Sequence, residues 1–555
     1  MSRIIADGIM DILRDWSVED LFICPGSTEA AVLDATLDRT DIRAVLVTHD
    51  SIAVSMADGF ARASGKPGVA YLHANVGLTN GISHLAAAFA ANSSVVLLNG
   101  LKSQRLHYRS GFTTARHMTD FVRDYVKWDA QPATAEATYS VMTHAFSRAM
   151  REPQGPVWVG LAEDVMEADE VSPPDSSLRF QHRVLTSADP LALDRAAEAL
   201  SSAGKLVIVA GGDVAKHNAA AALLELAEML GVPVLNEDRR GLQRVGIPTN
   251  HSHFAGYYTR DHELVKSADV IFFVGARCFV EFLVDDIPLM PERPMIIHSH
   301  VDPAQVGVLY GADIGLVGDE SIILAALLER LIALNAVRRQ LPQMLAKSNP
   351  RAVSSSEASG RSTEASGFPA RQAVVDIIAS LSEPDTIFVC DAVTATRILL
   401  DRLPLHSSDS YFASSAGSLG WGVGAAMGVK LALPDRPVMA ISGDGSFQFG
   451  IQGLWTAARY NIDVTFIVLN NQAFAAVGAA LRRYGRRAVE VGEYPGTDLS
   501  GPHLADVARG FGIDAVRVET LDQLRKALQD SASSGGPSVI EVMTQQLDWI
   551  PQESL

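Results

Sequence analysis

Short runs of β-branched residues alternate with Ala- and Leu-rich stretches along most of this chain, and this alternation limits the folds open to it. The runs include "AVLVT", "GVAYLHA" and "SVVLLNG" early in the chain, "KLVIVAGG" and "DVIFFVGA" in the middle, and "TIFVCDA" and "VTFIVLNN" late. Strand-length runs separated by helix-length segments are typical of parallel sheets covered by helices. We therefore predict an α/β protein made of doubly wound parallel-sheet domains.

The length and one low-complexity stretch suggest how the chain divides. A chain of 555 residues is too long for one hydrophobic core and suggests about three domains. The stretch "SNPRAVSSSEASGRSTEASG" is rich in Ser, Ala and Gly without an apolar period, which is typical of a linker. We predict domains at 1–180, 185–345 and 366–555, with the linker at 346–365.

The first and third predicted domains share a local pattern. Each has a strand, a Gly-containing loop and a helix of small residues: "HANVGLTNG" precedes "SHLAAAFAA", and "SSAGSLGWG" precedes "GAAMGVKLA". This internal similarity indicates two related sheets facing each other, with a different domain between them.

The charge and cysteine content exclude several classes of protein. The formal net charge of −18 argues against a nucleic-acid or anionic-membrane partner, because those surfaces bind clustered Lys and Arg. Cys24, Cys278 and Cys390 lie far apart, which fits neither a disulfide framework nor a zinc site but does fit a reducing cytosol. The N-terminal "MSRIIADGIMDILRDW" has the pattern of an amphipathic helix rather than a signal peptide, and no apolar run approaches the ~20 residues of a membrane span. We predict a cytoplasmic protein.

Asp50 raises the first functional question. In "THDSIAVSMADGFARASGKPG" it follows a His and precedes a run of small, helix-forming residues. Aspartate commonly caps helices, because its carboxylate accepts the free N–H groups of the first turn. The alternative is an acid that takes part in chemistry.

The strongest motif is "GDGSFQFGIQGLWTAARYNIDVTFIVLNN", in which Asp444 and Asn471 each follow a predicted strand. Residues 446–469, 24 in all, separate Gly445 from the Asn pair, with a helix between the two strands. Both polar ends then lie at the carboxyl edge of a parallel sheet, where ligands bind in open α/β folds. Asp and Asn oxygens suit a Mg²⁺ that bridges to a diphosphate, and glycine lets backbone N–H groups approach phosphate.

With this motif the chain resembles the thiamine-diphosphate enzymes, in the group of benzoylformate decarboxylase, pyruvate decarboxylase and acetolactate synthase. The resemblance covers essentially the whole chain and is closest to benzoylformate decarboxylase in "LWTAARYNIDVTFIVLNN", "GSLGWGVGAAMGVKLALPDR" and "SMADGFARASGKPGVAYLHA". It implies an N-terminal pyrimidine-binding, a central and a C-terminal diphosphate-binding domain. It also implies thiamine diphosphate, Mg²⁺, and a homodimer or homotetramer with active sites between chains.

The resemblance assigns residues to the cofactor and its metal. Asp444 and Asn471, with the Ala473 carbonyl, are the implied Mg²⁺ ligands. Leu419 is the implied wedge that bends the cofactor, although alone it would be taken for a core residue, and the Gly417 carbonyl is the implied acceptor from the aminopyrimidine. The other implied cofactor contacts are Thr394, Gly445, Ser446 and Phe474.

The resemblance also assigns catalytic residues, and here the chain departs from the family. His73 in "YLHANVG" matches an active-site His, and Ser27 in "CPGSTEA" matches a residue that contacts the substrate carboxylate; taken alone, both suggest structural roles. The acid beside the aminopyrimidine is usually Glu, and the aligned residue here is Asp50, which is shorter by about 1.3–1.5 Å. Glu29 is the nearest alternative acid, but its turn is expected to face substrate, so we assign the role to Asp50.

A second departure concerns the substrate pocket. Phe282 aligns with a second catalytic His of benzoylformate decarboxylase, and a phenyl ring cannot carry protons. Ala476 and Val477 are expected to give the pocket a different shape. The turn "AGGDV" in the central domain is no FAD fingerprint, so FAD is not expected.

These observations lead to one expected function and two alternatives. We expect a thiamine-diphosphate- and Mg²⁺-dependent decarboxylase of a 2-oxo acid with an apolar or aromatic side chain, in which the cofactor accepts the electrons released as CO₂ leaves. Carboligation is an expected side activity. The first alternative is a dedicated carboligase or lyase of acetolactate synthase or 2-hydroxyacyl-CoA lyase type. The second is a binding protein that kept the fold but activates the cofactor poorly.

Overall fold

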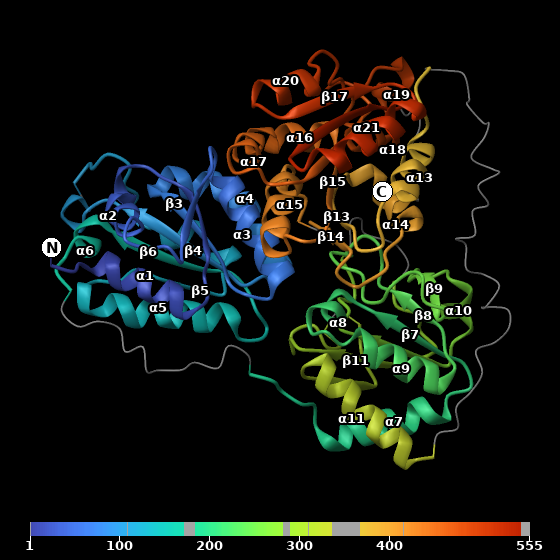
Figure 1. Cartoon of the computed structure of the whole chain (residues 1–555). Helices are drawn as coiled ribbons and strands as arrows, with labels where there is room; N and C mark the ends of the chain where they lie inside the picture. Colours follow the sequence, from blue (N-terminus) through green and yellow to red (C-terminus); the bar gives the residue numbers. More distant parts are fainter. Residues whose placement is uncertain are drawn as a thin grey trace. The chain divides into compact units, whose positions relative to one another are not determined.

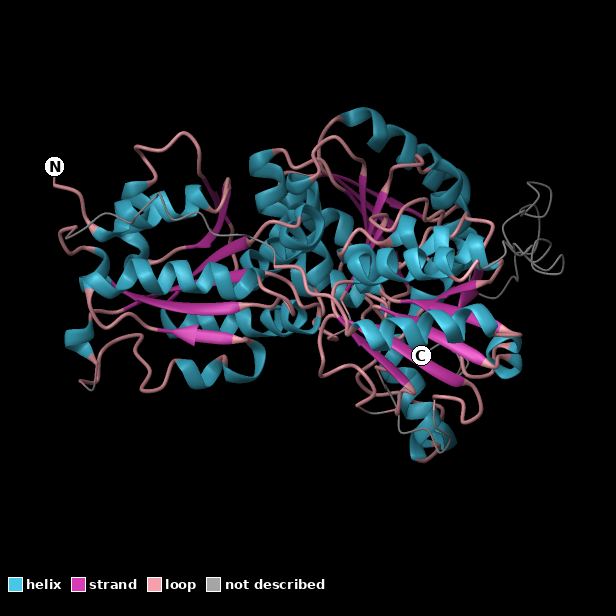
Figure 2. Ribbon diagram, turned by 90° about the horizontal axis from the view of Figure 1, so that it is seen from below, coloured by secondary structure: helices cyan, strands magenta, loops and turns pink. Residues whose placement is uncertain are grey.

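The chain contains three parallel β-sheets of six strands, each flanked by helices (Figures 1 and 2). The computed structural model describes residues 2–107, 109–170, 184–280, 289–308, 310–335, 367–414 and 416–545. The predicted α/β class with doubly wound parallel sheets is confirmed. The predicted linker at 346–365 lies outside the described residues, and the predicted domain bounds stay a prediction.

The first sheet has the strand order β2-β1-β3-β4-β6-β5. Its strands are rich in branched aliphatic residues and are mostly buried, as expected for a sheet covered on both faces. The strands are β1 (Asp20–Cys24), β2 (Arg43–Leu46), β3 (Gly68–His73), β4 (Val95–Leu101), β5 (Trp128–Ala130) and β6 (Val157–Ala162). The helices are α1 (Ile5–Asp15), α2 (Ala30–Ala35), α3 (Asp50–Ser64), α4 (Ala74–Ala90), α5 (Ala135–Met150) and α6 (Glu163–Met166).

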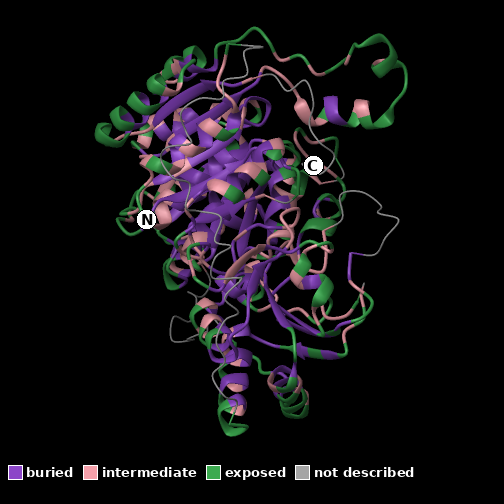
Figure 3. Cartoon of the chain, turned by 90° about the vertical axis from the view of Figure 1, so that its right-hand side faces the viewer, coloured by how far each residue is buried: buried purple, intermediate pink, exposed green. Residues whose placement is uncertain are grey.

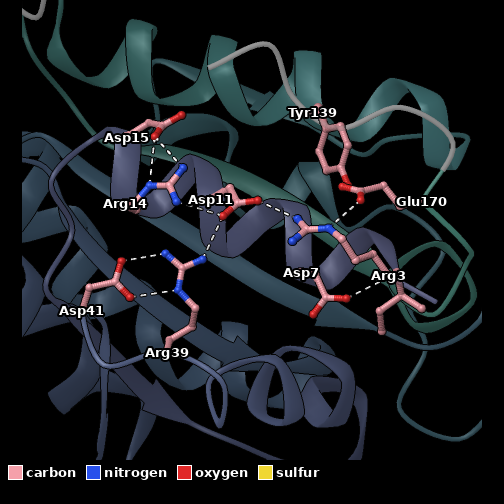
Figure 4. Close-up of polar contacts among 10 residues, drawn as sticks. Arg3, Asp7, Asp11, Arg14, Asp15, Arg39, Asp41, Tyr139 and Glu170 are labelled. Carbon is pink, nitrogen blue, oxygen red and sulfur yellow. Dashed lines mark hydrogen bonds and ion pairs between the residues drawn. The ribbon is translucent and has the colours of Figure 1, made fainter. Parts of the chain in front are cut away.

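The predicted N-terminal amphipathic helix is α1, and an ion-pair network fixes its polar face (Figure 4). Asp11 accepts hydrogen bonds from Arg3 at 2.6 Å and from Arg39 at 2.9 Å. Arg3 also donates to Glu170 at 2.7 Å, and Arg39 donates to Asp41 at 2.6 and 2.8 Å. Single surface pairs stabilise little, but a linked set of bidentate arginines orders three chain segments together.

The central sheet has a different strand order, β12-β11-β10-β7-β8-β9. This order reverses direction between β7 and β10, as in dinucleotide-binding folds. The strands are β7 (Leu206–Ala210), β8 (Val234–Asn236), β9 (Phe254–Tyr257), β10 (Val270–Val274), β11 (Met295–His300) and β12 (Ile314–Val317). The helices are α7 (Pro190–Ser202), α8 (Gly212–Lys216), α9 (Ala220–Leu230), α10 (Glu263–Ser267) and α11 (Glu320–Ala333).

The third sheet, β14-β13-β15-β16-β18-β17, repeats the order of the first when its strands are counted from its own first strand. The strands are β13 (Ile387–Asp391), β14 (Tyr411–Ala413), β15 (Val438–Gly443), β16 (Thr465–Asn470), β17 (Asp514–Val518) and β18 (Ser538–Met543). The helices are α13 (Arg371–Leu381), α14 (Thr396–Arg402), α15 (Trp421–Ala432), α16 (Asp444–Gly450), α17 (Leu454–Tyr460), α18 (Ala475–Tyr484), α19 (Arg487–Val491), α20 (Leu504–Gly510) and α21 (Leu521–Ser534).

Packing groups the chain into two compact units. One comprises Met1–Val184, Val389–Val393 and Ala416–Trp549, and the other comprises Leu185–Phe388, Thr394–Ser415 and Ile550–Leu555. The strands form the buried interior of the sheets, and exposed residues concentrate on the outer helices and loops (Figure 3). In the described part of the chain, no helix is both long enough and apolar enough to span a membrane.

Within the first unit, α3 and α15 form the most extensive helix–helix contact. Each is the helix that connects the second strand of its domain to the third. Glycines permit the close approach: a Cβ at Gly59 would lie 2.2 Å from the Ala425 carbonyl oxygen, and one at Gly428 would lie 2.0 Å from that of Met56. The N-terminus of α3, where Asp50 lies, is thereby held in the same unit as the turn that leads into α15.

Candidate active site

Asp444 is the first residue of α16 and follows β15 directly. Its buried carboxylate accepts hydrogen bonds from the N–H groups of Gly445 at 2.9 Å and Ala473 at 3.2 Å. Burial raises the pKa of the Asp444 carboxyl to about 6, and the two backbone donors limit the rise. The site therefore makes it costly to keep this charge without a nearby cation.

Asn471 supplies a second oxygen beside Asp444. In one orientation of its amide, the nitrogen donates to the Ala473 carbonyl oxygen at 3.0 Å and to Asp444 Oδ1 at 3.3 Å. In the other orientation, three oxygens face one another across these same distances, which only a cation between them would stabilise. Among the described residues, no group of three or more His, Cys, Asp or Glu side chains is placed to bind a metal. At this loop, an amide and a carbonyl oxygen accompany the single carboxylate of Asp444.

The loop that carries Asn471 is held rigidly. The preceding Asn470 donates to the buried Glu541 at 2.6 Å and accepts from the N–H of Gln472 at 2.9 Å. Gln472 has a left-handed backbone, with φ of 56°. Such strain at a non-glycine residue persists only where surrounding contacts fix it, and it clusters at functional sites. Of the Asn pair, Asn470 therefore supports the loop and Asn471 faces Asp444.

The neighbours of Asp444 in sequence have partners within the chain. A Cβ at Gly445 would lie 2.5 Å from the Phe474 ring, so only glycine fits beneath that ring. The Ser446 hydroxyl forms a hydrogen bond with Asp391, at the end of β13. Gly445, Ser446 and Phe474 are thus packed around the predicted metal loop.

Asp391 is a site residue that our sequence analysis missed. It is buried, and its Oδ2 accepts from the N–H groups of Gly420 at 2.9 Å and Gly422 at 3.2 Å. Burial raises the pKa of its carboxyl to about 6. These bonds fix the turn before α15, in which Gly417 has a left-handed φ of 68° and Leu419 is half-buried.

Thr394 lies in the short 3₁₀ helix that follows β13. Its hydroxyl and its carbonyl oxygen accept from Arg371 Nη1 at 3.0 and 3.3 Å. Its predicted contact with a diphosphate stays a prediction.

Asp50 does not cap its helix. The cap of α3 is His49, whose Nδ1 accepts from the N–H of Ser51 at 3.2 Å, and Asp50 is the first helical residue. Asp50 is only 6% exposed; its Oδ2 accepts from Asn80 at 3.1 Å, and its Oδ1 is buried without a hydrogen-bond partner. A Cβ at Gly77 would lie 2.4 Å from Oδ1, so glycine makes the room for this oxygen. The Cys24 thiol interacts with this carboxylate, but Oδ1 still lacks a hydrogen bond of normal geometry, so it has capacity for a further donor.

A second residue that sequence analysis missed, His84 on α4, links Asp50's helix to the Leu419 turn. Its Nδ1 faces the Ser51 carbonyl oxygen at 2.7 Å, and its Nε2 faces that of Leu419 at 3.3 Å. Ser418 donates to the carbonyl oxygen of the adjacent Ser83 at 2.6 Å. Burial lowers the pKa of His84, so the neutral ring carries one hydrogen for two acceptors.

His73 ends β3 and is held by two residues of the turn after β1. Its Nδ1 lies 2.8 Å from Thr28 Oγ1 and 3.0 Å from Glu29 Oε2. Thr28 donates its hydroxyl to Glu29 Oε1 at 2.5 Å, and a carboxylate only accepts, so the hydrogen bonds place the His73 ring hydrogen on Nδ1. Nε2 of the neutral ring is then left with its lone pair, as a proton acceptor.

The expectation that the turn around Glu29 faces substrate stays a prediction, but Glu29 itself points inward. Its side chain is fully buried, and its Oε2 also accepts from the N–H of Gly26 at 2.7 Å. Every bond of this carboxylate serves to orient the turn and His73. Ser27, in the same turn, is exposed and accepts from Lys102 at 2.9 Å.

The backbone after His73 is strained as well. Ala74 has a φ of 49°, in the left-handed region. The buried Asn99 amide donates to the carbonyl oxygens of Leu72 and Ala74, both at 2.9 Å, and accepts from Trp158 at 3.3 Å. Sequence analysis did not single out Asn99, because its function depends on contacts across the sheet.

At the carboxyl-terminal edge of the central sheet, acidic side chains of the chain itself occupy the space. Glu237 is buried and accepts from the N–H groups of Gly212 at 3.0 Å and Arg277 at 3.2 Å. Burial raises the pKa of its carboxyl to about 8. His300 pairs with Asp213 at 3.2 Å. The Gly212 amide of "AGGDV" thus already binds a carboxyl group of the chain.

The predicted pocket residues are only partly described. Phe282 lies outside the described residues. Ala476 is half-buried and Val477 is 42% exposed, both in the first turn of α18.

Comparisons with known proteins place these features in a family. Three models of the thiamine pyrophosphate enzymes match the chain: the N-terminal TPP-binding domain over residues 4–123, the central domain over 193–327 and the C-terminal TPP-binding domain over 392–542. Benzoylformate decarboxylase of Pseudomonas aeruginosa is 31% identical over 547 residues, covering 97% of this chain and 98% of that protein.

Two further relatives have similar coverage. A probable acetolactate synthase large subunit of Methanocaldococcus jannaschii is 28% identical over 570 residues, covering 98% of this chain and 93% of that protein. The structure of the thiamine diphosphate-dependent 4-hydroxybenzoylformate decarboxylase of Rhodococcus jostii RHA1 has a TM-score of 0.86 and 26% identity, covering 99% of this chain and 100% of that one.

Proposed function

This chain belongs to the thiamine pyrophosphate enzymes, and on that premise we propose that it is a thiamine-diphosphate- and Mg²⁺-dependent decarboxylase of a 2-oxo acid. The observation that carries the proposal is the buried, unpartnered Oδ1 of Asp50, at the helix start where the family places its activating acid. When bound, thiamine diphosphate supplies the carbon nucleophile and accepts the electrons released as CO₂ leaves.

The oxygens around Asp444 suit the proposed Mg²⁺. Mg²⁺ prefers octahedral oxygen coordination at about 2.0–2.1 Å, which places neighbouring ligands about 3 Å apart. The Asn471 amide lies at this spacing from two other groups, 3.0 Å from the Ala473 carbonyl oxygen and 3.3 Å from Asp444 Oδ1. We assign these three as Mg²⁺ ligands, and Thr394, Gly445, Ser446 and Phe474 as residues around the diphosphate.

Asp50 would hold the aminopyrimidine end. Asn80 fixes Oδ2, which leaves Oδ1 to share a proton with a ring nitrogen of the cofactor. Because Oδ1 is buried, that hydrogen bond would form without competition from water. Leu419 would support the bent cofactor, and the Gly417 carbonyl would accept from its amino group.

His73 and Ser27 would act on the substrate. The Thr28 and Glu29 contacts leave Nε2 of His73 as the basic nitrogen, and an imidazole exchanges protons readily near neutral pH. Ser27 is exposed in the adjacent turn and would donate to the substrate carboxylate.

The similarity to an aryl 2-oxo acid decarboxylase favours a substrate with an apolar or aromatic side chain. Ala476, Val477 and Phe282 are the proposed pocket residues. A dedicated carboligase is the second candidate, favoured by the similarity to an acetolactate synthase over nearly the whole chain.

Turnover on a panel of 2-oxo acids tests the proposal. CO₂ and a free aldehyde from one 2-oxo acid support decarboxylation, whereas an acyloin or a 2-hydroxy-2-alkyl-3-oxo acid supports carboligation. NMR measurement of C2–H exchange in bound thiamine diphosphate tests cofactor activation separately. Exchange no faster than in the free cofactor would contradict both enzyme functions and favour the binding-protein alternative.

We further propose a cytoplasmic homodimer or homotetramer with active sites completed between chains. The three free cysteines support the location. The family supports the assembly, which the mixing experiment in the Discussion tests.

A further inference from the structure

Lys102 follows β4 directly and links the ends of two other strands. Its Nζ donates to Ser27 Oγ at 2.9 Å and to Glu163 Oε1 at 2.7 Å. Ser27 lies in the turn after β1, and Glu163 is the first residue of α6, after β6. The Lys102 and Glu163 side chains are only 15% and 22% exposed, so the ion pair is shielded from water.

The Lys102 contact determines what the Ser27 hydroxyl can do. An ammonium group only donates hydrogen bonds, so Ser27 Oγ must accept from it. The hydroxyl hydrogen is then free to point elsewhere, and Ser27 becomes a donor. A carboxylate only accepts, so a hydroxyl fixed in this sense is the correct partner for the carboxylate of a 2-oxo acid.

Glu163 determines how much charge this arrangement brings to the substrate. A lone ammonium beside the reacting carboxylate would stabilise the anionic ground state more than the transition state, in which negative charge leaves that group, and would slow CO₂ loss. The Glu163 carboxylate neutralises the ammonium at 2.7 Å and also accepts from the N–H of Ser103 at 3.3 Å. The pair therefore directs Ser27 while adding no net charge.

Ser27 lies beside His73. A Cβ at the adjacent Gly26 would come within 2.5 Å of the His73 ring, so the backbone of this turn packs directly against the imidazole. The Ser27 hydroxyl and the His73 ring thus lie at the same edge of the first sheet.

We propose that Lys102 and Glu163 are positioning residues for decarboxylation: Lys102 makes Ser27 a dedicated hydrogen-bond donor to the substrate carboxylate, and Glu163 prevents Lys102 from holding that carboxylate too strongly. This inference rests on the proposed function, because it assumes that Ser27 meets the substrate carboxylate. The two residues of one ion pair then have opposite effects on binding and turnover.

Steady-state kinetics of CO₂ release by the holoenzyme tests these opposite effects. Lys102→Met combined with Glu163→Gln removes the pair without leaving a charge, so only the direction of the hydroxyl is lost; KM should rise about 5- to 10-fold and kcat should change less than about twofold. Lys102→Met alone should raise KM further, because the Glu163 carboxylate is then an unpaired anion near the substrate carboxylate. Lys102→Arg should restore KM, since a guanidinium also only donates. Glu163→Gln should lower KM several-fold and lower kcat about tenfold, because the ammonium is then unpaired.

A double-mutant cycle and a matched control isolate the effect. Ser27→Ala should raise KM, and adding Lys102→Met together with Glu163→Gln should raise it no further, because the neutral pair acts through Ser27. The controls Lys66→Met and Glu19→Gln remove an exposed ion pair of 2.8 Å in the same domain and should leave kcat and KM unchanged. Equal and additive losses in all variants would overturn the proposal.

Binding of benzoate, a carboxylate without an oxo group, gives a readout independent of turnover. Titration of the holoenzyme by calorimetry should give weaker binding for Lys102→Met and tighter binding for Glu163→Gln than for wild type. If no 2-oxo acid is decarboxylated, the proposed function fails while benzoate still tests the pair. If both variants weaken benzoate equally, or neither changes it, the pair has no directing role and the inference fails.

Discussion

The first and third sheets have the same strand order, yet their carboxyl ends present opposite chemistry. The first sheet gathers donors and a proton acceptor there: Ser27, His73 and Lys102. The third gathers oxygens, from Asp444, Asn471 and the Ala473 carbonyl. One arrangement thus suits an anionic substrate and the other suits a cation with its diphosphate.

At the carboxyl-terminal edge of the central sheet, the chain's own side chains face one another and the backbone N–H groups. Glu237 accepts from two backbone N–H groups, and His300 faces Asp213. In the first and third sheets, by contrast, Asp50 keeps an unpartnered buried oxygen, and the Asn471 amide lies 3.0 and 3.3 Å from two oxygens, those of the Ala473 carbonyl and Asp444. The central edge also holds two buried atoms without a hydrogen bond, Asp213 Oδ2 and His300 Nε2, but these lie 3.2 Å from each other, whereas Asp50 Oδ1 faces a space kept open by Gly77.

The largest effect expected is that of Asp50→Ala. If the first sheet supplies the activating acid, C2–H exchange of bound thiamine diphosphate should slow by about 10²- to 10⁴-fold, the range for general acid–base groups. Cofactor binding should change only slightly, because the third sheet holds the diphosphate. NMR exchange and equilibrium dialysis measure the two quantities, and Asp50→Glu serves as the control that restores the carboxyl. Full exchange in the Ala variant would show that another acid acts.

Asp444→Ala should show the reverse pattern, with loss of cofactor retention. Removing a metal ligand should weaken Mg²⁺-dependent thiamine diphosphate binding by about 100-fold or more, since even outer-sphere partners contribute 10- to 100-fold. Dialysis with and without EDTA measures the loss. Asp435→Ala, an exposed acid in the same domain, is the matched control. If both variants retain thiamine diphosphate equally well, Asp444 does not bind the cation.

The pH dependence should differ between the cofactor-free and the loaded protein. Burial raises the pKa of Asp444 and Asp391 to about 6, above their unfolded value near 3.8. The folded chain therefore holds more protons than the unfolded chain between about pH 4 and 6, and stability falls as pH rises through this range, by up to about 3 kcal/mol per group. Bound Mg²⁺ and cofactor should abolish the fall in stability that Asp444 causes, because the cation stabilises its charged form. Cofactor affinity should rise as the pH rises through about 6.

Thermal unfolding at pH 4.5 and 7 checks this prediction. Asp444→Asn should reduce the pH dependence of the stability of the cofactor-free protein. The pH dependence that Asp391 contributes should remain. A cofactor-free protein that gains stability between these two pH values would contradict the assignment.

A mixing experiment asks whether the two edges of one site come from one chain or from two. Asp50→Ala and Asp444→Ala chains, each inactive alone, are unfolded or dissociated together and reassembled. If sites form between chains of a symmetric dimer, random mixing restores about a quarter of wild-type activity, since half of the dimers are mixed and each has one intact site. Activity of the mixture that stays at the background of either variant would indicate that each site lies within one chain.

The smallest effect is expected in the central sheet. With a carboxyl pKa of about 8, Glu237 is largely protonated at pH 7, so Glu237→Gln replaces one neutral group with another. We expect the free energy of unfolding at pH 6 to change by less than about 1 kcal/mol. At pH 9 the variant should be more stable than the wild type, because the wild-type carboxyl must ionise there while buried. Thermal unfolding at both values measures this, and cofactor retention should not change. A large loss at pH 6 would show that Glu237 is ionised.

Much of the fold could be predicted from local patterns. The run at 68–74 corresponds to β3 and "DVIFFVGA" to β10, because long branched runs have few alternatives to a buried strand. The strands β5 and β14 have three residues each and carry no periodic signal, so they went unpredicted. The internal similarity of the first and third domains is confirmed by their common strand order.

The candidate site was predictable where a motif carries it and unpredictable where only tertiary contacts do. Asp444 and Asn471 lie together because the motif spaces two adjacent strands. Glu29, Asp391 and Lys102 gain their significance from partners that are distant in sequence. Burial of Glu29 in particular was invisible, because a Pro-Gly-Ser turn usually faces solvent.

The left-handed backbone at Ala74 has a consequence for engineering this chain. Glycine at this position would relieve strain of about 1 kcal/mol, so a library selected for heat resistance alone would enrich it. The same glycine would free the backbone that follows His73 and that the Asn99 amide now clamps. Consensus or thermostability designs should therefore leave positions 74 and 99 unchanged.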